Sequence, residues 1–525
     1  MEYESVQSIS ETSESVDEDK ILGNPRVFLT SFRLNFPGFL FCLISATQDF
    51  LDLYFIKKGF DTRGVTIVSI SSIVRNIVIG LGGFHSQGVT KKFSEYIAKK
   101  DYKSIGKLYV EALRFNLILG IILSSVLIGI IPSLIPSLGI PEEFKSDTLK
   151  YLLPIALFPT FVIHFLYSCS ILLATGRAIL AGALQIVALV TSLLMDPVFI
   201  YLFKAKISLM GIAFVSGPFI MSIILFFTFA FHVFENIKPN WHAFIEKPTS
   251  DFWHVIKSSF PLLTTISLGV VTPLVFTLLM KRAASKDTTE IVTVYSTSMK
   301  VFILMAATVA GGMSGVIPLA VFALHTKDKP RFVKVVLYSL ILPGIVIVIL
   351  CTIMVVKPFL IMQIWIHDPV MISYIPKISS IPFYTGFLVP ITELFILLTI
   401  VMGYGGLAVV PPLVKATALF TSAIVFLKVA KNNAIALLYA YNFQDVFGLV
   451  GAGSVFLYCY IHTKKEYFSE FSVVSGKLLE EEAFIYMILT KTIIISVLIM
   501  IYFFKTVSEL MVVVFIQQNL TMSNL

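Results

Sequence analysis

Long apolar runs recur along almost the whole chain of 525 residues, and they limit its possible folds more than any other feature. A helix of about 20 apolar residues crosses the hydrocarbon core of a bilayer. Backbone groups cannot stay unpaired in lipid, so runs of this length must be helical, whereas barrel strands would be short and alternating. The sequence therefore predicts an all-α polytopic membrane protein with spans at approximately 34–56, 65–89, 110–134, 149–174, 178–203, 209–234, 258–281, 291–322, 332–357, 375–401, 406–430, 434–462 and 484–516.

The composition excludes the main alternatives. Hydrophobic residues make up 57% of the chain and charged residues 14%, which leaves too little polar surface to cover water-soluble domains. A net charge of +8 fits Lys and Arg at lipid headgroups, so no nucleic-acid partner is expected. No Walker A loop, catalytic dyad or metal-ligand spacing occurs, so we expect neither an enzyme nor a bound cofactor.

The distribution of basic residues predicts the orientation. The connectors richest in Lys and Arg, Lys91–Lys107 and Lys327–Lys334, lie on the same side of the predicted membrane as the N-terminus. Cytoplasmic loops carry this excess, so the N-terminus is predicted to be cytoplasmic. The protein is expected to be a monomer in the plasma membrane or an internal membrane.

An internal repeat divides the chain. Gly88-Val89 and Lys100-Asp101 recur as Gly315-Val316 and Lys327-Asp328, both at an offset of 227 residues. Each half holds six spans, an even number, so both halves enter the membrane from the same face. This pattern predicts two six-helix bundles related by a pseudo-twofold axis along the membrane normal, which is a transporter architecture.

The repeat also predicts the domain boundaries. The expected segments are an acidic cytoplasmic tail at 1–33, an N-lobe at 34–234, an inter-lobe cytoplasmic linker at 235–257, a C-lobe at 258–462, and a final loop, thirteenth transmembrane helix and tail at 463–525.

Ionisable residues inside the spans are the first candidates for a functional site, because their burial in lipid is costly. Asp49 and Asp52 lie one turn apart on one helix face, and their mutual repulsion favours the binding of a proton. Asp52 could instead cap the helix end. Asp196 could likewise terminate a helix as part of an Asp-Pro pair. Arg75 is placed to reach these carboxylates, where it would compete with Na⁺ or neutralise a buried aspartate.

The C-lobe carries a second set of intramembrane charges. Glu393 is a candidate for a substrate or proton role. Lys300 could form a salt bridge with Glu393 or Asp445, or it could attract an anionic substrate. Gln185 and Gln444 could line the transport cavity or join helices by hydrogen bonds.

Three stretches resemble the multidrug and toxin extrusion (MATE) family of the multidrug, oligosaccharidyl-lipid and polysaccharide exporter superfamily. The resemblance covers about residues 30–462. The stretches are Pro37 with Asp52 fifteen residues later, followed by Leu53-Tyr54-Phe55 and Gly59; Ala174-Thr175-Gly176, Ser192-Leu193-Leu194-Met195-Asp196-Pro197 and Gly211-Ile212-Ala213; and Gly403-Tyr404-Gly405-Gly406.

The resemblance implies two lobes around a central cavity and export of organic drugs or metabolites, cationic or amphipathic, by alternating access. It also implies influx of H⁺ or Na⁺ as the driving force, with Asp52 and Asp196 in the cation site and a span-ten carboxylate near Glu393. Two positions depart from the family. Ser192 replaces an Asn four residues before Asp-Pro, and Gly269 stands where span seven often has a glutamate. The alternatives are a lipid-linked saccharide or lipid flippase, for which Arg75 and Lys300 could line a cationic cavity, and a transport-inactive member.

Overall fold

The chain is helical throughout its described part, without a strand. The computed structural model describes residues 21–137, 142–204, 206–234, 237–282, 288–364, 366, 369–429 and 434–467. Within these residues nine helices are long and apolar enough to cross a membrane, or ten when the bent pair Lys145–Leu157 and Pro159–Ala174 counts as one span. The prediction of an all-α multi-pass membrane protein is thus confirmed. The thirteenth span lies outside the described residues.

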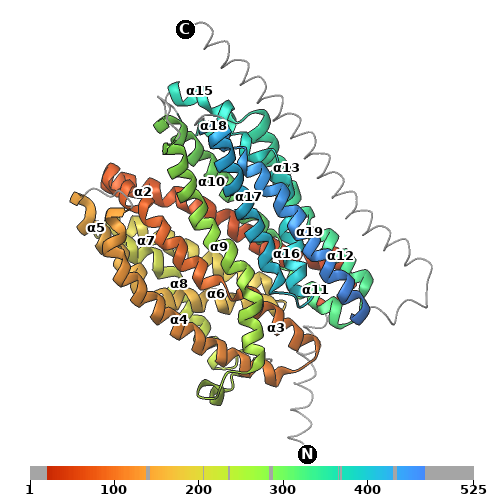
Figure 1. Ribbon diagram of the computed structural model, residues 1–525. Coiled ribbons are helices and arrows are strands. Elements are labelled where there is room, and N and C mark those ends of the chain that lie inside the picture. The colour runs from red at the N-terminus through yellow and green to blue at the C-terminus, as the bar shows by residue number, and fades with distance from the viewer. Residues whose placement is uncertain are drawn as a thin grey trace, which may run out of the picture. The chain divides into compact units, whose positions relative to one another are not determined.

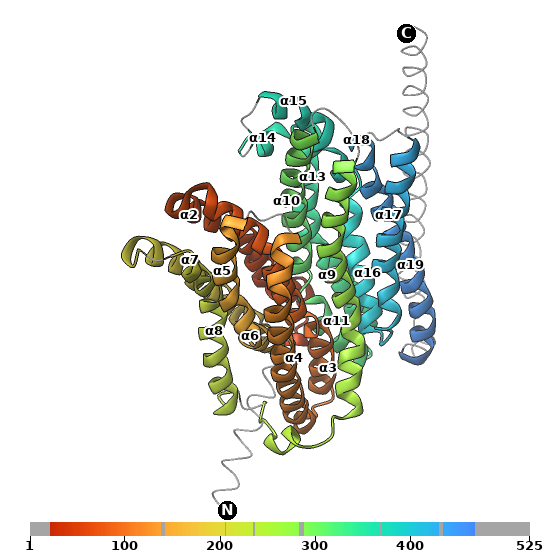
Figure 2. The ribbon, with the colours of Figure 1, turned by 60° about the vertical axis from the view of Figure 1, so that its left-hand side comes forward.

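The first of two compact units holds the N-terminal helices. It comprises Met1–Val270, Ala306–Pro343 and Ile400–Val409. Within it α4 packs against α6, and α7 packs against both α2 and α8, as Figure 2 shows. Its complete helices are α2 (Val27–Gly83), α3 (Ser86–Ala98), α4 (Tyr102–Ser137), α5 (Lys145–Leu157), α6 (Pro159–Ala174), α7 (Ala178–Pro197), α8 (Ser208–Ala230), α11 (Val316–His325) and α12 (Lys329–Ser339), with short turns at Glu142–Phe144, Val198–Leu202, Trp241–Phe244 and Leu407–Val409.

The second unit comprises Val271–Met305, Gly344–Thr399 and Val410–Leu525. In it α17 packs along α19 (Figure 1). Besides α16 (Val389–Val401), three helices contain residues of both units: α9 (Ser250–Arg282), α10 (Thr288–Gly312) and α13 (Ile341–Val356). The remaining helices are α14 (Phe359–Met362), α15 (Pro369–Ile378), α16 (Val389–Val401, with its last two residues in the first unit), α17 (Val410–Val429), α18 (Ala434–Leu437) and α19 (Ala440–Tyr467), with short turns at Ile381–Phe383 and Gly386–Leu388.

Helix α2 covers the first predicted span and most of the second, 65–89. It is a single element of 57 residues, Val27–Gly83. Asp52 and Arg75 nevertheless form an ion pair at 3.4 Å, although they are 23 positions apart. A straight helix would separate them by about 34 Å at about 1.5 Å per residue, so α2 must reverse direction between them.

The repeat is visible in the backbone at the ends of α3 and α11. Lys100 and Lys327 both adopt the left-handed conformation, with φ of 58° and 56°. The next residues, Asp101 and Asp328, each accept a hydrogen bond from the backbone N–H three positions on, at 3.1 and 3.0 Å. The same helix stop and the same N-cap therefore occur at the offset of 227 residues. The lobe boundaries and the twofold relation of complete bundles stay predictions.

Proline and glycine shape the turns around α6. Pro159 occupies the first turn of α6, where its missing N–H is tolerated, and α5 meets α6 there at a bend of 46°. Gly176 ends α6 with a φ of +77°, a conformation that favours glycine. The Ala174-Thr175-Gly176 motif is thus a helix stop that leads into α7.

Candidate functional site

Two aspartates and one arginine meet in the interior of the first unit. Asp52 and Arg75 come from the two arms of α2, and Asp196 comes from the last turn of α7. Their exposed fractions are 6%, 6% and 5%. An Oδ atom of Asp52 lies 3.4 Å from an Nη atom of Arg75. Asp196 interacts electrostatically with both Asp52 and Arg75. The structure thus brings these three predicted residues together, and their role in ion coupling stays a prediction.

The cluster encloses a very small cavity. Its volume is about 10 Å³, close to the least that holds one water molecule. Phe214 covers the guanidinium of Arg75 at 5.0 Å from the ring centroid, a cation–π contact. Besides these residues, the lining consists of Gln48, Ile56, Tyr151, Ser192 and Met210. The site is therefore closed, charged and large enough only for a very small occupant.

The protonation of the cluster follows from its contacts. Two buried carboxylates, Asp52 and Asp196, face the single guanidinium of Arg75, so the three side chains carry one negative charge when both carboxylates are ionised. One proton and one guanidinium balance two carboxylates, which makes the cluster neutral. Loss of the proton leaves one negative charge among the three side chains. A buried charge of this kind is costly, so the cluster favours a bound monovalent cation.

Ser192 lies beside the cluster, but its hydroxyl is already used by the packing of α7 on α8. It donates to the carbonyl of Phe214 at 3.1 Å and accepts from the backbone N–H of Gly217 at 3.2 Å. A Cβ at Gly217 would lie 1.8 Å from the carbonyl oxygen of Ala188. This close approach explains why a glycine stands there and positions Ser192, with Asp196 one helical turn further along.

The C-terminal charges form a separate cluster in the second unit. Glu393 of α16 pairs with Lys415 of α17 at 3.1 Å, and both side chains are largely buried. Lys415 passes over Gly448 of α19, where a Cβ would lie 2.5 Å from the lysine Cγ. The sequence analysis overlooked Lys415, although a lysine inside the apolar run Val410–Val429 is a signal of the same kind as Lys300.

Asp445 lies deeper in the second unit and accepts a hydrogen bond from Thr385. The oxygen–oxygen distance is 2.8 Å, and the same hydroxyl lies 3.0 Å from the side-chain oxygen of Asn442. All three side chains are buried. Lys415 also interacts electrostatically with Asp445 and so links Glu393 to Asp445. Thr385 and Asn442 gave no sequence signal, because uncharged polar residues are common in membrane helices.

The structure does not test the roles of the other predicted site residues. Lys300 of α10 has an exposed side chain, and its pairing with Glu393 or Asp445 stays a prediction. Gln185 of α7 and Gln444 of α19 are partly buried. Asp49 lies in α2, and its side chain is outside the described residues. Whether any of these residues contacts substrate or the coupling ion stays a prediction.

Known proteins match this chain in both sequence and fold. A family model described as MatE matches residues 38–198. The multidrug export protein MepA of Staphylococcus aureus is 25% identical over 185 residues, which cover 34% of this chain and 40% of that protein's length. MepA of Staphylococcus saprophyticus is 22% identical over 320 residues, covering 60% of this chain and 69% of the relative.

Two solved structures share the fold at low sequence identity. A crystal structure of MATE in complex with MaL6 has a TM-score of 0.75 at 13% identity and covers 85% of this chain and 98% of that one. A transporter of the MOP superfamily from Pyrococcus furiosus, reported with a binding pocket of reversed polarity, also has a TM-score of 0.75 at 13% identity. The match covers 85% of this chain and 97% of that one. The chain is therefore similar to MatE proteins over residues 38–198 and shares the fold of MATE transporters, and its apolar helices indicate an integral multi-pass membrane protein.

Proposed function

We propose that this protein is a secondary exporter of organic drugs or metabolites that works by alternating access and is driven by inward movement of protons. The observation that carries the proposal is the buried cluster of Asp52, Arg75 and Asp196. The cytoplasmic N-terminus expected from the loop charges belongs to the same proposal.

The cluster supplies a physical basis for coupling. With one proton the three side chains are neutral, and without it they carry one negative charge. Burial of that charge in the closed site is costly, whereas exposure to water is not. Protonation therefore stabilises the closed arrangement of α2 and α7, and release of the proton favours an arrangement that opens the site. Differential proton affinity of two conformations is what coupling requires.

The surroundings favour a proton over Na⁺. A sodium ion needs several oxygen ligands, and the guanidinium of Arg75, 3.4 Å from Asp52, would repel it. The hydroxyl of Ser192, which stands in place of the family's Asn, already contacts Phe214 and Gly217. The cavity of about 10 Å³ has little room for a coordination shell. A proton binds to one carboxylate oxygen and needs none of these ligands.

The second unit suggests which cargo is transported. Glu393 is paired with Lys415, so this site presents both signs of charge rather than a bare carboxylate. We propose amphipathic organic molecules with at most one net positive charge, contacted in this unit by Glu393, Asp445, Lys300 and Gln444. The relatives' name, multidrug export protein, supports organic cargo of varied shape.

The test is flux in proteoliposomes. Purified protein is reconstituted, and uptake of a fluorescent organic cation and of an anionic dye is followed under an imposed pH gradient or an imposed Na⁺ gradient. We expect the pH gradient to drive accumulation of the cationic dye and the Na⁺ gradient to have no effect. Glu246→Gln, an exposed substitution outside the cluster, is the matched control.

The outcomes separate the alternatives. Flux driven by Na⁺ alone would exclude proton coupling but retain the antiporter. A response to neither gradient would contradict the exporter proposal and favour a lipid flippase or a transport-inactive member, which a lipid-scrambling assay on the same vesicles distinguishes.

A further inference from the structure

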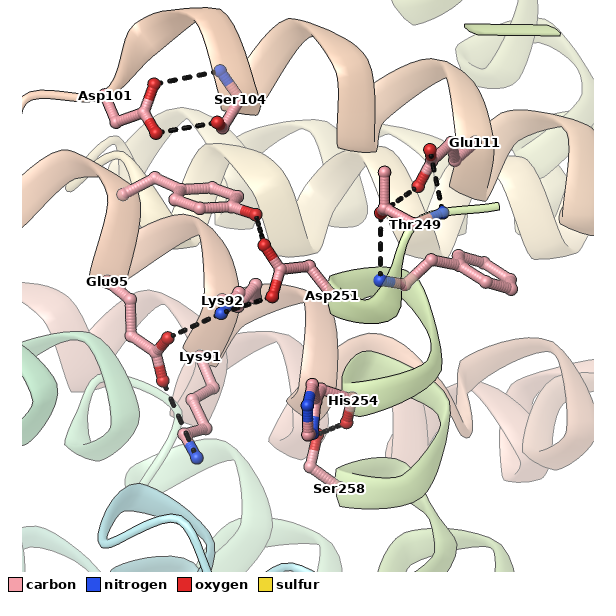
Figure 3. Close-up of polar contacts among 12 residues, drawn as sticks. Lys91, Lys92, Glu95, Asp101, Ser104, Glu111, Thr249, Asp251, His254 and Ser258 are labelled. Carbon is pink, nitrogen blue, oxygen red and sulfur yellow. Dashed lines mark hydrogen bonds and ion pairs between the residues drawn. The ribbon is translucent and has the colours of Figure 1, made fainter. Parts of the chain in front are cut away.

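A polar pocket lies where α3, the start of α9 and the glycine turn after α16 meet, and it shares no residue with either charge cluster. We call it the α3–α9 pocket. Its volume is about 330 Å³. Figure 3 shows the lining side chains Lys91, Lys92, Glu95, Asp251, His254 and Ser258. The lining residues are Gly88, Lys91, Lys92, Glu95, Asp251, His254, Val255, Lys257, Ser258, Gly403, Gly405 and Gly406.

Both carboxylates of the pocket are already engaged. Asp251 accepts hydrogen bonds from the hydroxyl of Tyr96 at 2.5 Å and from the ammonium of Lys92 at 3.0 Å. Glu95 accepts from Lys92 at 3.1 Å and lies 3.6 Å from the ammonium of Lys91. Lys92 thus bridges the two carboxylates, and little acceptor capacity is left for the other cations (Figure 3).

Two lysines remain that these carboxylates do not fully balance. Lys91 is mostly buried, and burial lowers its pKa more than the neighbouring Glu95 raises it. Lys257 has an exposed side chain and forms no ion pair within the described part of the chain. Three lysines face two carboxylates, so the pocket has one positive charge in excess, apart from the imidazole of His254.

The glycine turn lies against both of these lysines. Gly403 has a φ of +95°, a conformation that favours glycine, and a Cβ there would lie 3.9 Å from the ammonium of Lys91. A Cβ at Gly406 would lie 3.4 Å from Cε of Lys257. Both are distances of ordinary van der Waals contact, so the turn brings its backbone close to the two lysines.

Hydrogen bonds to Glu111 of α4 fix the start of α9, which forms one wall of the pocket. The carboxylate of Glu111 accepts from the backbone N–H and the hydroxyl of Thr249, at 3.2 and 2.7 Å, just before α9 begins. The hydroxyl of Thr249 in turn accepts from the backbone N–H of Phe252 at 3.3 Å, as an N-cap does. The first turn of α9, with Asp251 and His254, is therefore fixed relative to the preceding helices.

We propose that the α3–α9 pocket binds a phosphate monoester, with Lys91 and Lys257 as its principal cationic contacts. A volume of 330 Å³ lies at the lower end of the range for ligand pockets and suits one small anionic group. Lysine is a common point-charge contact for phosphate. The phosphate could belong to a soluble metabolite or to a lipid headgroup, because both present the same chemistry. This proposal does not depend on the export function.

Two probes distinguish the sources. The full-length protein is placed in phosphatidylcholine nanodiscs and titrated with inorganic phosphate by calorimetry. In parallel, nanodiscs that contain phosphatidic acid are compared with phosphatidylcholine alone by native mass spectrometry. We expect at least one probe to bind, and Lys257→Gln to weaken that binding about tenfold, the loss expected when a charge-assisted contact is removed. Lys257→Arg should retain most of the affinity.

The controls keep the outcome interpretable. Lys257 is exposed, so its substitution should not impair folding, whereas Lys91→Gln changes a buried residue and is used only as a second variant. Lys107→Gln removes a nearby lysine outside the pocket and should bind like the wild type. Retention of phosphatidic acid alone indicates a lipid headgroup, and binding of inorganic phosphate indicates a soluble ligand. The proposal is overturned when neither probe binds, or when Lys257→Gln binds as tightly as Lys107→Gln.

Discussion

The carboxylate of Asp52 lies 3.4 Å from the guanidinium of Arg75, although both residues belong to the same helix, 23 positions apart. This contact holds the two arms of α2 together and places a permanent cation beside the aspartates of the proposed coupling site. One ion pair thus serves both the fold and the charge balance of the site.

Replacement of Arg75 by Gln should therefore destabilise the protein. Removal of one partner of a buried ion pair leaves an uncompensated charge and costs roughly 3 kcal/mol or more. We expect a lower thermal unfolding midpoint for the purified protein in detergent. The double variant Asp52→Asn/Arg75→Gln should recover most of the lost stability but not transport. A double variant as unstable as the single one would contradict the pairing.

Replacement of Asp196 by Asn should abolish efflux and leave the protein folded in the membrane. The amide cannot take up or release the coupling proton, but it keeps the size and the hydrogen-bonding capacity of the carboxyl group. Dye efflux and membrane abundance are measured together, with Glu246→Gln as the control. Wild-type efflux by Asp196→Asn would exclude Asp196 from the coupling.

Much of this arrangement was predictable from the sequence. Apolar run length predicts the spans, because lipid accepts only a backbone that is internally paired. The cost of charge in lipid singles out Asp52, Arg75 and Asp196. The turns at Lys100 and Lys327 show that the repeat offset of 227 residues reflects the same local backbone.

Partner choice was not predictable in the same way. From the sequence, Lys300 is a possible partner of Glu393. In the structure Glu393 forms an ion pair with Lys415. That pairing depends on the packing of α17 against α19, where Gly448 makes room for the lysine stem. Likewise, nothing in the spacing of Thr385 and Asp445 indicates that they meet, because the contact joins segments far apart in the chain.

The pairing of Glu393 with Lys415 should appear in a double-mutant cycle. Glu393→Gln and Lys415→Met each leave one charge without its partner in a largely buried place, whereas the double variant removes both charges. We expect the two effects on the unfolding midpoint to be strongly non-additive. Lys428→Met, an exposed lysine on the same helix, should combine additively with Glu393→Gln. Additive effects for Lys415→Met would contradict the ion pair.

The junction of α3 and α9 should weaken in acid. Burial alone would raise the pKa of Asp251, but the hydrogen bonds from Tyr96 and Lys92 outweigh it and hold the pKa below its ordinary value. A depressed carboxyl pKa contributes stability above the unfolded-state value of about 3.9, and this contribution is lost as the pH falls. Lys92 has the opposite pH dependence. Burial lowers the pKa of Lys92, but Glu95 and Asp251 outweigh burial and raise the pKa. The contribution of Lys92 to stability is therefore present below about pH 10.4 and is lost as the pH rises through the raised pKa.

Asp251→Asn should therefore flatten the acid side of the stability profile. The measurement is the unfolding midpoint from about pH 3 to pH 8, compared with that of Glu143→Gln, whose exposed carboxylate is not part of the junction. An unchanged acid slope in Asp251→Asn would show that the Asp251 contacts with Tyr96 and Lys92 contribute nothing to stability.

A methyl group at Gly217 should disturb the coupling site without touching a charge. The Cβ of Gly217→Ala would lie 1.8 Å from the carbonyl oxygen of Ala188, so α7 and α8 must separate. Ser192 of α7 forms hydrogen bonds with Phe214 and Gly217 of α8 at this contact, and Asp196 follows one turn later on α7. We expect a loss of roughly 1–3 kcal/mol from overpacking, together with reduced efflux. Gly129→Ala is the matched control, since no atom lies within 4 Å of its added methyl group. Equal behaviour of the two variants in unfolding and efflux would show that the close approach of α7 to α8 does not position the site.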